Sequence, residues 1–228
     1  MTEEQNSLLN SWLGDFAIVH DHSWPLQDTT VLHVWTADGR DFIVKASTTS
    51  HHVRREITAY TMGFNGLSDG VPVLVHASRE ARILVTQFLP GTLVEGAAAE
   101  ADPETYRQAG ALLGKIHQPA GVSSDYAKAL AAKTRSAINR AYGLVPESHR
   151  IRLAEELGVL NPGPVQLVTT HGDYQPRNWL QEDGRIKVID FGRADARPWV
   201  HDLVRLTHQQ FLRPGSLRCL LRRAGKES

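Results

Sequence analysis

The order of two polar segments near the end of the chain constrains its fold more than any other feature. In the first segment, His171 to Asn178, the carboxylate of Asp173 stands five residues before the carboxamide of Asn178. The second segment, Asp190-Phe191-Gly192, places another carboxylate directly after a run of β-forming residues, twelve positions beyond Asn178. Either segment alone is more often a simple turn than a site. In this order and spacing, they predict a fold that brings the three polar side chains together.

These three side chains suit phosphoryl transfer. The transition state of that reaction spreads negative charge over the phosphoryl oxygens, so catalysis depends on positioning and electrostatics. Magnesium prefers oxygen ligands, and Asn178 and Asp190 supply a carboxamide oxygen and a carboxylate oxygen. Asp173 is then free to accept the hydrogen bond of an attacking hydroxyl and to take its proton. The pattern therefore predicts Asp173 as the catalytic base and the other two residues as magnesium ligands.

The first part of the chain has the pattern of a small antiparallel sheet with one helix. Five runs of apolar and β-branched residues predict strands at residues 16–19, 29–36, 41–45, 71–75 and 82–88. Asp38-Gly39 separates the second and third runs and predicts a tight hairpin, because glycine tolerates the positive φ of such turns. Apolar residues at helical spacing predict a helix over residues 51–64, with Gly63 and Gly66 marking its end.

Beyond Pro90-Gly91 the pattern becomes mainly helical, which predicts an N-lobe of residues 1–89 and a C-lobe of residues 90–228. Asp102 is predicted to cap a helix that runs to about His117. Further helices are predicted over residues 127–142 and 147–157 and from about Trp199, and short strands over residues 165–169, 179–180 and 185–189. The predicted fold class is therefore α+β.

The composition excludes several classes of partner. Among 228 residues, 25 basic and 25 acidic side chains give a formal net charge of zero, so neither nucleic acid nor an acidic membrane surface is expected as a partner. No run approaches the roughly 18 apolar residues that span a bilayer, and Met1 to Gln5 lack the pattern of a secretion signal. Cys219 stands alone and cannot form an internal disulfide, so a cytoplasmic location is predicted.

The run HGDYQPRN, followed by IDFGRA and then by Pro198 to Leu203, resembles the aminoglycoside phosphotransferase and choline kinase family. The likeness covers about residues 16–205. It implies a two-lobed, protein-kinase-like fold, with a small antiparallel sheet and one helix in the N-lobe and a mainly helical C-lobe. It also implies the same catalytic and magnesium-binding roles for the three polar side chains, while His171 would brace the loop.

The resemblance further implies a nucleotide site in the N-lobe. Lys45 and Glu56 would form the ion pair that holds an ammonium group against the α- and β-phosphates. Gln87, Phe88 and Leu89 would form the hinge between the lobes, where backbone groups bind the adenine edge. The implied donor is ATP or GTP with Mg²⁺, and the implied acceptor is a small hydroxylated molecule.

Two features depart from the pattern of that family. The stretch His20 to Asp28, where a glycine-rich loop would cover the phosphates, contains no glycine, and bulky Trp24 hinders close backbone approach. Asp21 and Asp28 would repel phosphate if they pointed inward. Only 36 residues follow Gly192, so the C-lobe is either minimal or truncated, and the protein is expected as a monomer or a homodimer.

Several side chains near the polar segments leave their roles open. Arg177 would meet the γ-phosphate or an acidic substrate, or it would pair with a neighbouring carboxylate. Asp202 would brace the catalytic loop, a role we favour over binding an acceptor amine. Arg193 and Asp195 are expected to be structural.

Three classes of function follow. The favoured one is a small-molecule kinase that transfers the γ-phosphoryl group of ATP or GTP to a hydroxyl of an aminoglycoside-like antibiotic or a similar metabolite. Because acidic residues do not cluster around the catalytic loop, choline, homoserine or a sugar competes as acceptor. The glycine-free loop leaves a nucleotide-binding pseudokinase open, although all four chemical roles are filled. A protein kinase is disfavoured, because no Ala-Pro-Glu segment follows Gly192.

Overall fold

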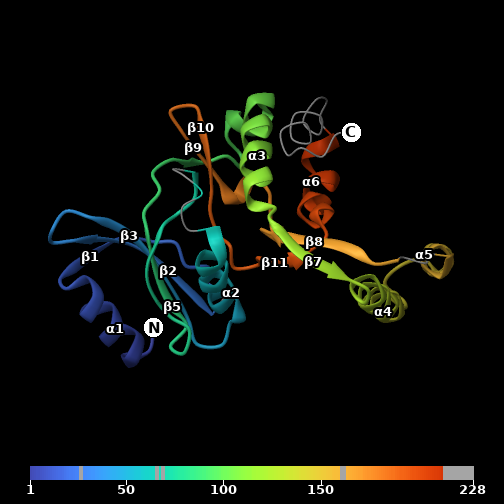
Figure 1. Ribbon diagram of the computed structural model, residues 1–228, viewed down its shortest axis with the longest axis horizontal. Helices are drawn as coiled ribbons and strands as arrows, with labels where there is room; N and C mark the ends of the chain where they lie inside the picture. The colour runs from blue at the N-terminus through green and yellow to red at the C-terminus, as the bar shows by residue number, and fades with distance from the viewer. Residues whose placement is uncertain (26–27, 65–66, 68–69, 160–162, 213–228) are drawn as a thin grey trace.

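The computed structural model describes residues 1–25, 28–64, 67, 70–159 and 163–212. Within them an antiparallel sheet forms the N-terminal part and a mainly helical region forms the C-terminal part (Figure 1). α2 (His51–Ala59) lies between the two parts. This arrangement confirms the predicted α+β, kinase-like fold class.

The N-terminal sheet has five strands in the order β1-β2-β3-β5-β4, and each neighbouring pair is antiparallel. The strands are β1 (Phe16–Asp21), β2 (Thr29–Thr36), β3 (Asp41–Ser47), β4 (Leu74–Ser78) and β5 (Ile83–Gln87). The β2–β3 hairpin closes over Asp38-Gly39, where Gly39 has a φ of 84°, as predicted. β4 begins at Leu74 rather than Val71, because the Val71 side chain is buried in the core of the C-terminal part.

The two faces of this sheet meet different helices. Phe42 and Val44 of β3 are buried in the same cluster as Leu9 of α1 (Glu3–Leu13), which covers one face. Successive side chains of a strand point to opposite faces, so Lys45 points away from α1 and toward α2. The strand pattern thereby places Lys45 on the side of the C-terminal part.

α1 is absent from the sequence-based expectations, although a capping box marks its start. Thr2 Oγ1 accepts a hydrogen bond from the Gln5 N–H, and the Gln5 side chain accepts one from the Thr2 N–H. The buried Gln5 Nε2 also donates to the backbone oxygens of Ser47, at 3.0 Å, and Ala81, at 2.7 Å. These bonds fix the helix to the sheet.

α2 is shorter than the helix predicted over residues 51–64. Val53 faces the sheet, as its apolar stripe requires. The following residues, Tyr60–Phe64, form a π-helical turn in which Gly63 has a φ of 132°, and α2 stops before this turn. Gly66 lies outside the described residues.

The C-terminal part combines helices with two small three-stranded sheets, ordered β10-β9-β6 and β11-β8-β7. Its α-helices are α3 (Pro103–Ile116), α4 (Tyr126–Arg140), α5 (Glu147–Val159) and α6 (Val204–His208). Its strands are β6 (Thr92–Leu93), β7 (Pro119–Ser123), β8 (Val165–Thr170), β9 (Trp179–Glu182), β10 (Arg185–Val188) and β11 (Asp195–Arg197). Short 3₁₀ turns are η3 (Ala98–Ala101), η4 (Pro176–Asn178), η5 (Trp199–Leu203) and η6 (Gln210–Leu212).

The predicted helices and strands of this part are present, with small shifts of their ends. Asp102 caps α3 by accepting a hydrogen bond from the Glu104 N–H at 2.9 Å. The helix expected from Trp199 begins as a 3₁₀ turn and becomes α6 at Val204. The predictions lack β6, β7 and β11, because each is short and pairs with a strand distant in sequence.

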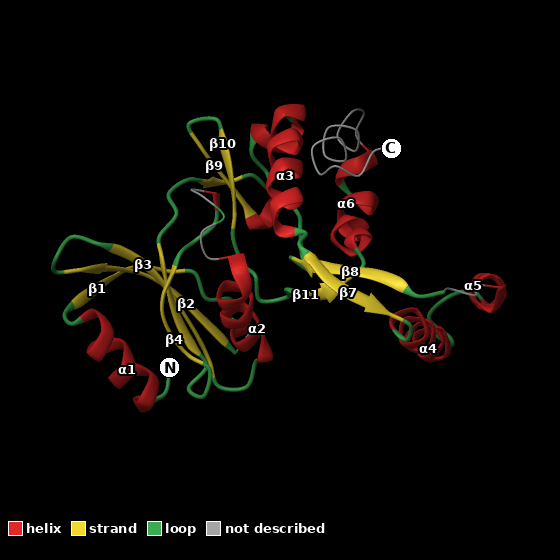
Figure 2. Ribbon diagram, in the orientation of Figure 1, coloured by secondary structure: helices red, strands yellow, loops and turns green. Residues whose placement is uncertain are grey.

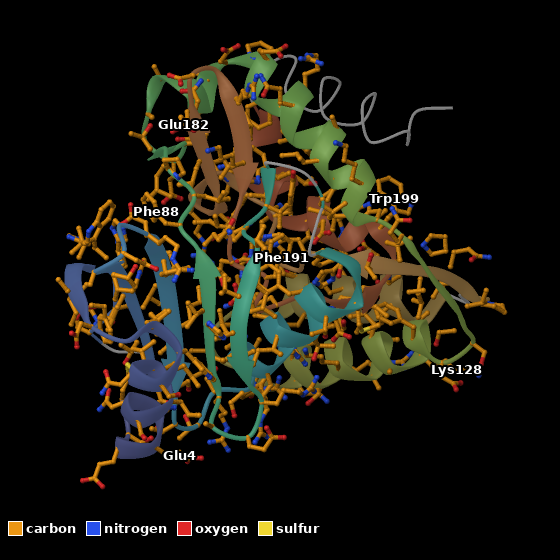
Figure 3. The ribbon with its side chains drawn as sticks, turned by 60° about the vertical axis from the view of Figure 1, so that its left-hand side comes forward. Glu4, Phe88, Lys128, Glu182, Phe191 and Trp199 are labelled. Carbon is orange, nitrogen blue, oxygen red and sulfur yellow. The ribbon has the colours of Figure 1, made fainter. Side chains whose placement is uncertain are left out.

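The core of the C-terminal part extends into the N-terminal part. The ring of Phe191, which is completely buried, contacts the rings of Tyr60, Phe64 and His171. Figure 3 shows Phe191 in the middle of the molecule. The two parts therefore share one core, and the division into lobes of residues 1–89 and 90–228 stays a prediction.

α4 and α5 form a helical hairpin at the end of the molecule opposite α1 (Figure 2). α4 has no buried residue. Within the described ranges, no helix is both long enough and apolar enough to cross a membrane. Cys219 and the basic tail around it lie outside the described residues.

Candidate active site

The loop of residues 171–175, named here the Asp173 loop, connects β8 to η4 in a tight conformation. Gly172 has a φ of 83°, and a Cβ at this position would lie 2.0 Å from the backbone oxygen of Arg193. Only glycine fits there. The loop therefore packs directly against the residues that follow Asp190-Phe191-Gly192, and the two polar segments lie side by side.

His171 holds the loop through both of its ring nitrogens. Nδ1 accepts a hydrogen bond from the Asp173 N–H at 3.3 Å, and Nε2 then donates to the Ile189 oxygen at 3.0 Å. Burial lowers the pKa of His171, so its imidazole is neutral, as this pairing requires. The contacts agree with a bracing residue that takes no part in proton transfer.

Asp202 anchors the loop from the opposite side. Its carboxylate accepts hydrogen bonds from the His171 N–H at 2.9 Å and the Gly172 N–H at 2.6 Å. It also pairs with His117 Nε2 at 2.9 Å. Its side chain has no exposed surface, which favours bracing over contact with an acceptor amine.

Asp173 is buried beneath a set of donors. Its Oδ1 accepts a hydrogen bond from Gln175 Nε2 at 2.7 Å and forms an ion pair with Arg205, whose Nε lies 2.9 Å away. Its Oδ2 accepts one from Arg177 at 2.6 Å, and Arg193 Nε lies 3.9 Å away. The carboxylate is therefore surrounded by positive charge, and an incoming hydroxyl competes with these donors for its oxygens.

Asn178 and Asp190 are adjacent through the backbone. The Ile189 N–H donates to the Asn178 oxygen at 2.9 Å, which places Asn178 beside the residue before Asp190. Asn178 Nδ2 donates to the backbone oxygen of Asp173 at 2.8 Å, so Oδ1 is the carboxamide atom left to accept. Asp190 has a φ of 66°, a left-handed conformation that is uncommon outside glycine, and it contacts Lys45.

The donor set around Asp190 fits a hard cation. The Asn178 carboxamide and the half-exposed Asp190 carboxylate supply oxygen atoms, which magnesium prefers. In the part of the chain that the structure describes, no group of three or more His, Cys, Asp or Glu side chains gathers to hold a metal. Such a site suits a cation that takes its remaining ligands from phosphate oxygens and water.

Lys45 and Glu56 form the pair expected from the sequence. Lys45 Nζ lies 3.0 and 2.9 Å from the two Glu56 oxygens and 3.1 Å from Asp190 Oδ1. Burial alone would lower the pKa of Lys45, but the carboxylates of Asp190 and Glu56 outweigh it and raise that pKa. Lys45 in turn lowers the pKa of Asp190 to about 2. Burial raises the pKa of Glu56, although Lys45 opposes this.

Two of the three predicted hinge amides are engaged within the protein. The Gln87 N–H donates to the Val73 oxygen at 2.9 Å, and the Phe88 N–H donates to the Asp41 oxygen at 3.1 Å. In the described ranges the Leu89 N–H has no such backbone partner. Among the three hinge N–H groups of the described ranges, that of Leu89 is thus the one without a backbone acceptor, and the adenine-binding roles of all three stay predictions.

The carboxylates of the glycine-free stretch between β1 and β2 accept hydrogen bonds from within the protein. Asp28 accepts hydrogen bonds from the hydroxyls of Thr48 and Thr49, which hold the pKa of Asp28 well below its usual range. Asp21 accepts one from a backbone N–H of its own turn at 2.8 Å. Residues 26–27 lie outside the described residues. Asp28 is thereby tied to the start of α2.

The contacts of Arg193 and Arg205 with Asp173 were not predicted from the sequence. Arg205 lies on α6, and nothing in its local sequence marks it as a partner of Asp173. Arg193 was expected to be structural, yet it lines a cavity of about 510 Å³ beside Asp173, as does Arg205. Of the two roles predicted for Arg177, the structure shows the pairing with a neighbouring carboxylate, which is that of Asp173.

Residues 26–224 match the phosphotransferase enzyme family. No curated protein sequence matches the chain. Several solved structures have a similar fold, and their sequence identities to this chain are so low that they show a likeness of fold alone. A macrolide 2'-phosphotransferase from Brachybacterium faecium, as apoenzyme, is 19% identical, with a TM-score of 0.72. The match covers 100% of this chain and 84% of that one.

Two other structures broaden the comparison. The ternary complex of APH(2'')-IIa with streptomycin and ATP is 16% identical with a TM-score of 0.66, covering 100% of this chain and 83% of that one. A candidate fructosamine-3-kinase from Thermobifida fusca is 17% identical with a TM-score of 0.67, covering 97% of this chain and 84% of that one. Similar folds thus occur in proteins named for antibiotic and for sugar-derived substrates.

Proposed function

Because the chain belongs to the phosphotransferase enzyme family, we propose that it is a small-molecule kinase that transfers the γ-phosphoryl group of ATP to a hydroxyl group. The observation that carries the proposal is a chain of hydrogen bonds and one peptide bond that links the four residues. It runs from Lys45 to Asp190, from the neighbouring Ile189 to Asn178, and from Asn178 to Asp173. The four residues to which we assign the chemical roles of phosphoryl transfer all belong to it.

In the proposed reaction the acceptor oxygen forms a bond to the γ-phosphorus, and the bond from this phosphorus to the β–γ bridging oxygen breaks. ADP leaves with that electron pair. Asp173 orients the acceptor hydroxyl and takes its proton. Lys45, held by Glu56, positions the α- and β-phosphates. Mg²⁺, when bound by Asn178 and Asp190, neutralises charge on the phosphates.

The acceptor class is wider than one group of antibiotics. Proteins of similar fold are named for, or described with, a macrolide, the aminoglycoside streptomycin and a fructosamine. Choline, homoserine and sugars remain acceptors of the same chemical type. GTP remains an alternative donor, and a cytoplasmic monomer or homodimer remains our expectation for the protein.

The experiment is a measurement of nucleoside diphosphate release with Mg²⁺ and either ATP or GTP. The acceptor panel contains aminoglycosides, macrolides, choline, homoserine and sugars. Asp173→Asn is assayed beside the parent, and Asp125→Asn serves as a control because its carboxylate is 86% exposed. We expect acceptor-dependent release that falls about 100-fold or more in Asp173→Asn and is unchanged in the control.

A second candidate is a nucleotide-binding pseudokinase. It is favoured by the glycine-free stretch and by the arginines that occupy Asp173. A pseudokinase would be stabilised against heat by magnesium nucleotide and would release no nucleoside diphosphate in the presence of any acceptor. Release that persists undiminished in a folded Asp173→Asn protein would instead remove Asp173 from the mechanism.

A further inference from the structure

The cavity beside Asp173 lies between the Asp173 loop and α6. It has a volume of about 510 Å³, and its lining includes Asp173, Arg193, His201, Arg205 and His208. If the proposed function holds, an acceptor must enter this cavity, because a hydroxyl has to reach Asp173. The charges that line the cavity therefore select the acceptor.

The charge that a guest would meet there is positive. The two carboxylates of the lining are almost inaccessible, since the side chain of Asp173 is 4% exposed and that of Asp202 is 0% exposed. The guanidinium side chains of Arg193 and Arg205 are 46% and 45% exposed. Arg177, which also contacts Asp173, is 38% exposed.

These arginines outnumber their carboxylate. Within the described ranges, every ion pair of Arg177, Arg193 and Arg205 goes to Asp173. Together with the buried carboxylate of Asp202, two negative charges oppose the three positive ones, so one positive charge stays uncompensated, and the charged surface that a guest can reach is that of the guanidinium groups. A polycation would be repelled from such a place, whereas an oxyanion would find planar donors suited to bind it in pairs.

We propose that the acceptor is an anionic alcohol, a small molecule that carries a carboxylate or phosphate besides its reacting hydroxyl. Arg205 and Arg193 bind the anionic group, and Arg205 leaves Asp173 Oδ1 to the hydroxyl. This inference rests on the proposed function and narrows it. It disfavours aminoglycosides, which are polycations, as acceptors.

If the arginines had a purely structural role, replacing Arg205 would not change the preference of the protein between anionic, neutral and cationic acceptors. The test therefore compares acceptors that share a scaffold and differ in charge. One set is glucose, glucuronate, glucose 6-phosphate and glucosamine, and the other is glycerol, glycerate, glycerol 3-phosphate and serinol. Kanamycin and erythromycin are added, and kcat and KM are measured for the parent, Arg205→Gln and Arg205→Lys.

The control variant is Arg152→Gln, because Arg152 lies on α5, is 78% exposed and pairs only with Glu156 in the described part of the chain. We expect the highest kcat/KM for an anionic member of a set, about 10-fold or more above its neutral partner. Arg205→Gln removes this preference mainly through KM, and Arg205→Lys restores part of it. A neutral or cationic compound with the highest kcat/KM overturns the inference and leaves the proposed function standing.

If the protein phosphorylates none of these compounds, the anionic site is tested by measuring binding. The thermal stabilisation by glucuronate and glucose 6-phosphate is compared with that by glucose, at ionic strength matched with potassium chloride. Stabilisation by an anionic probe that is lost in Arg205→Gln supports the anionic site even where the kinase proposal fails. Equal stabilisation by the anionic and neutral probes overturns the inference.

Discussion

Two residues of the candidate active site adopt backbone conformations that most residues avoid. Gly172 has a positive φ and no room for a side chain, and Asp190 has a positive φ without being glycine. Such conformations cost free energy and persist where surrounding contacts impose them. At Asp190 the contact is the ion pair with Lys45, which aims the carboxylate into the site.

This ion pair predicts how stability depends on pH. Lys45 lowers the pKa of Asp190 from 3.8 to about 2, so the stability it contributes is present above pH 3.8 and is lost as the pH falls toward 2. We expect Asp190→Asn to be less stable than the parent near pH 6 and the difference to shrink by about pH 3. The free energy of urea unfolding at several pH values measures this.

Asp125→Asn is the matched control, since Asp125 is 86% exposed and its nearest cation, Lys128, lies 3.9 Å away. The free energy of unfolding of Asp125→Asn should differ little from that of the parent at every pH. A difference for Asp190→Asn that stays constant from neutral to acidic pH would show that the ion pair adds no stability.

At the scale of elements, single polar side chains join one element to the next. Gln5 ties α1 to β3 and to the start of β5 through two backbone oxygens. Asp202 ties η5 to the Asp173 loop and to the end of α3 through His117. Buried polar atoms without partners are costly, so these links fix how the elements meet.

Gln5→Ala tests the link between α1 and the sheet. It would leave the oxygens of Ser47 and Ala81 without a buried donor and would also break the capping box. We expect a loss of about 2 kcal/mol in the free energy of unfolding, measured by urea denaturation. Asn10→Ala, at an exposed position of the same helix, should change the stability by less than about 0.5 kcal/mol. Equal effects of the two variants would contradict this role of Gln5.

At the scale of the whole molecule, one core joins the strand-rich part to the helical part. Phe191 contacts aromatic rings from both, namely Tyr60 and Phe64 on one side and His171 on the other. A core shared in this way couples the unfolding of the two parts. We therefore expect a single cooperative transition.

Phe191→Ala should lower the free energy of unfolding by about 3 to 5 kcal/mol, because it removes a fully buried ring. In the parent, tryptophan fluorescence and far-UV circular dichroism should report coincident urea transitions, since Trp12 and Trp179 lie in different parts. Leu144→Ala, at a side chain that is 83% exposed, is the neutral control. Two separated transitions in the parent would mean that the parts unfold independently.

The sequence by itself determined what depends on neighbours along the chain. The hairpin over Asp38-Gly39 and the Asp102 cap of α3 follow from local backbone preferences, and both are present. The spacing of the two polar segments also predicted that Asp173, Asn178 and Asp190 would gather. The start of α1 carried a local signal as well, in Thr2 and Gln5, that could have been recognised.

The tertiary structure decided what depends on contacts between distant residues. β7 contains a proline and a glycine, which disfavour strands, and its pairing with β8 overrides that preference. Arg205 meets Asp173 only because η5 and α6 pack against the Asp173 loop. Local sequence cannot encode such a meeting, since side-chain partners across the fold are set by packing. The type of chemistry could therefore be predicted from the chain, whereas the charge of the cavity beside Asp173 was decided only by the fold.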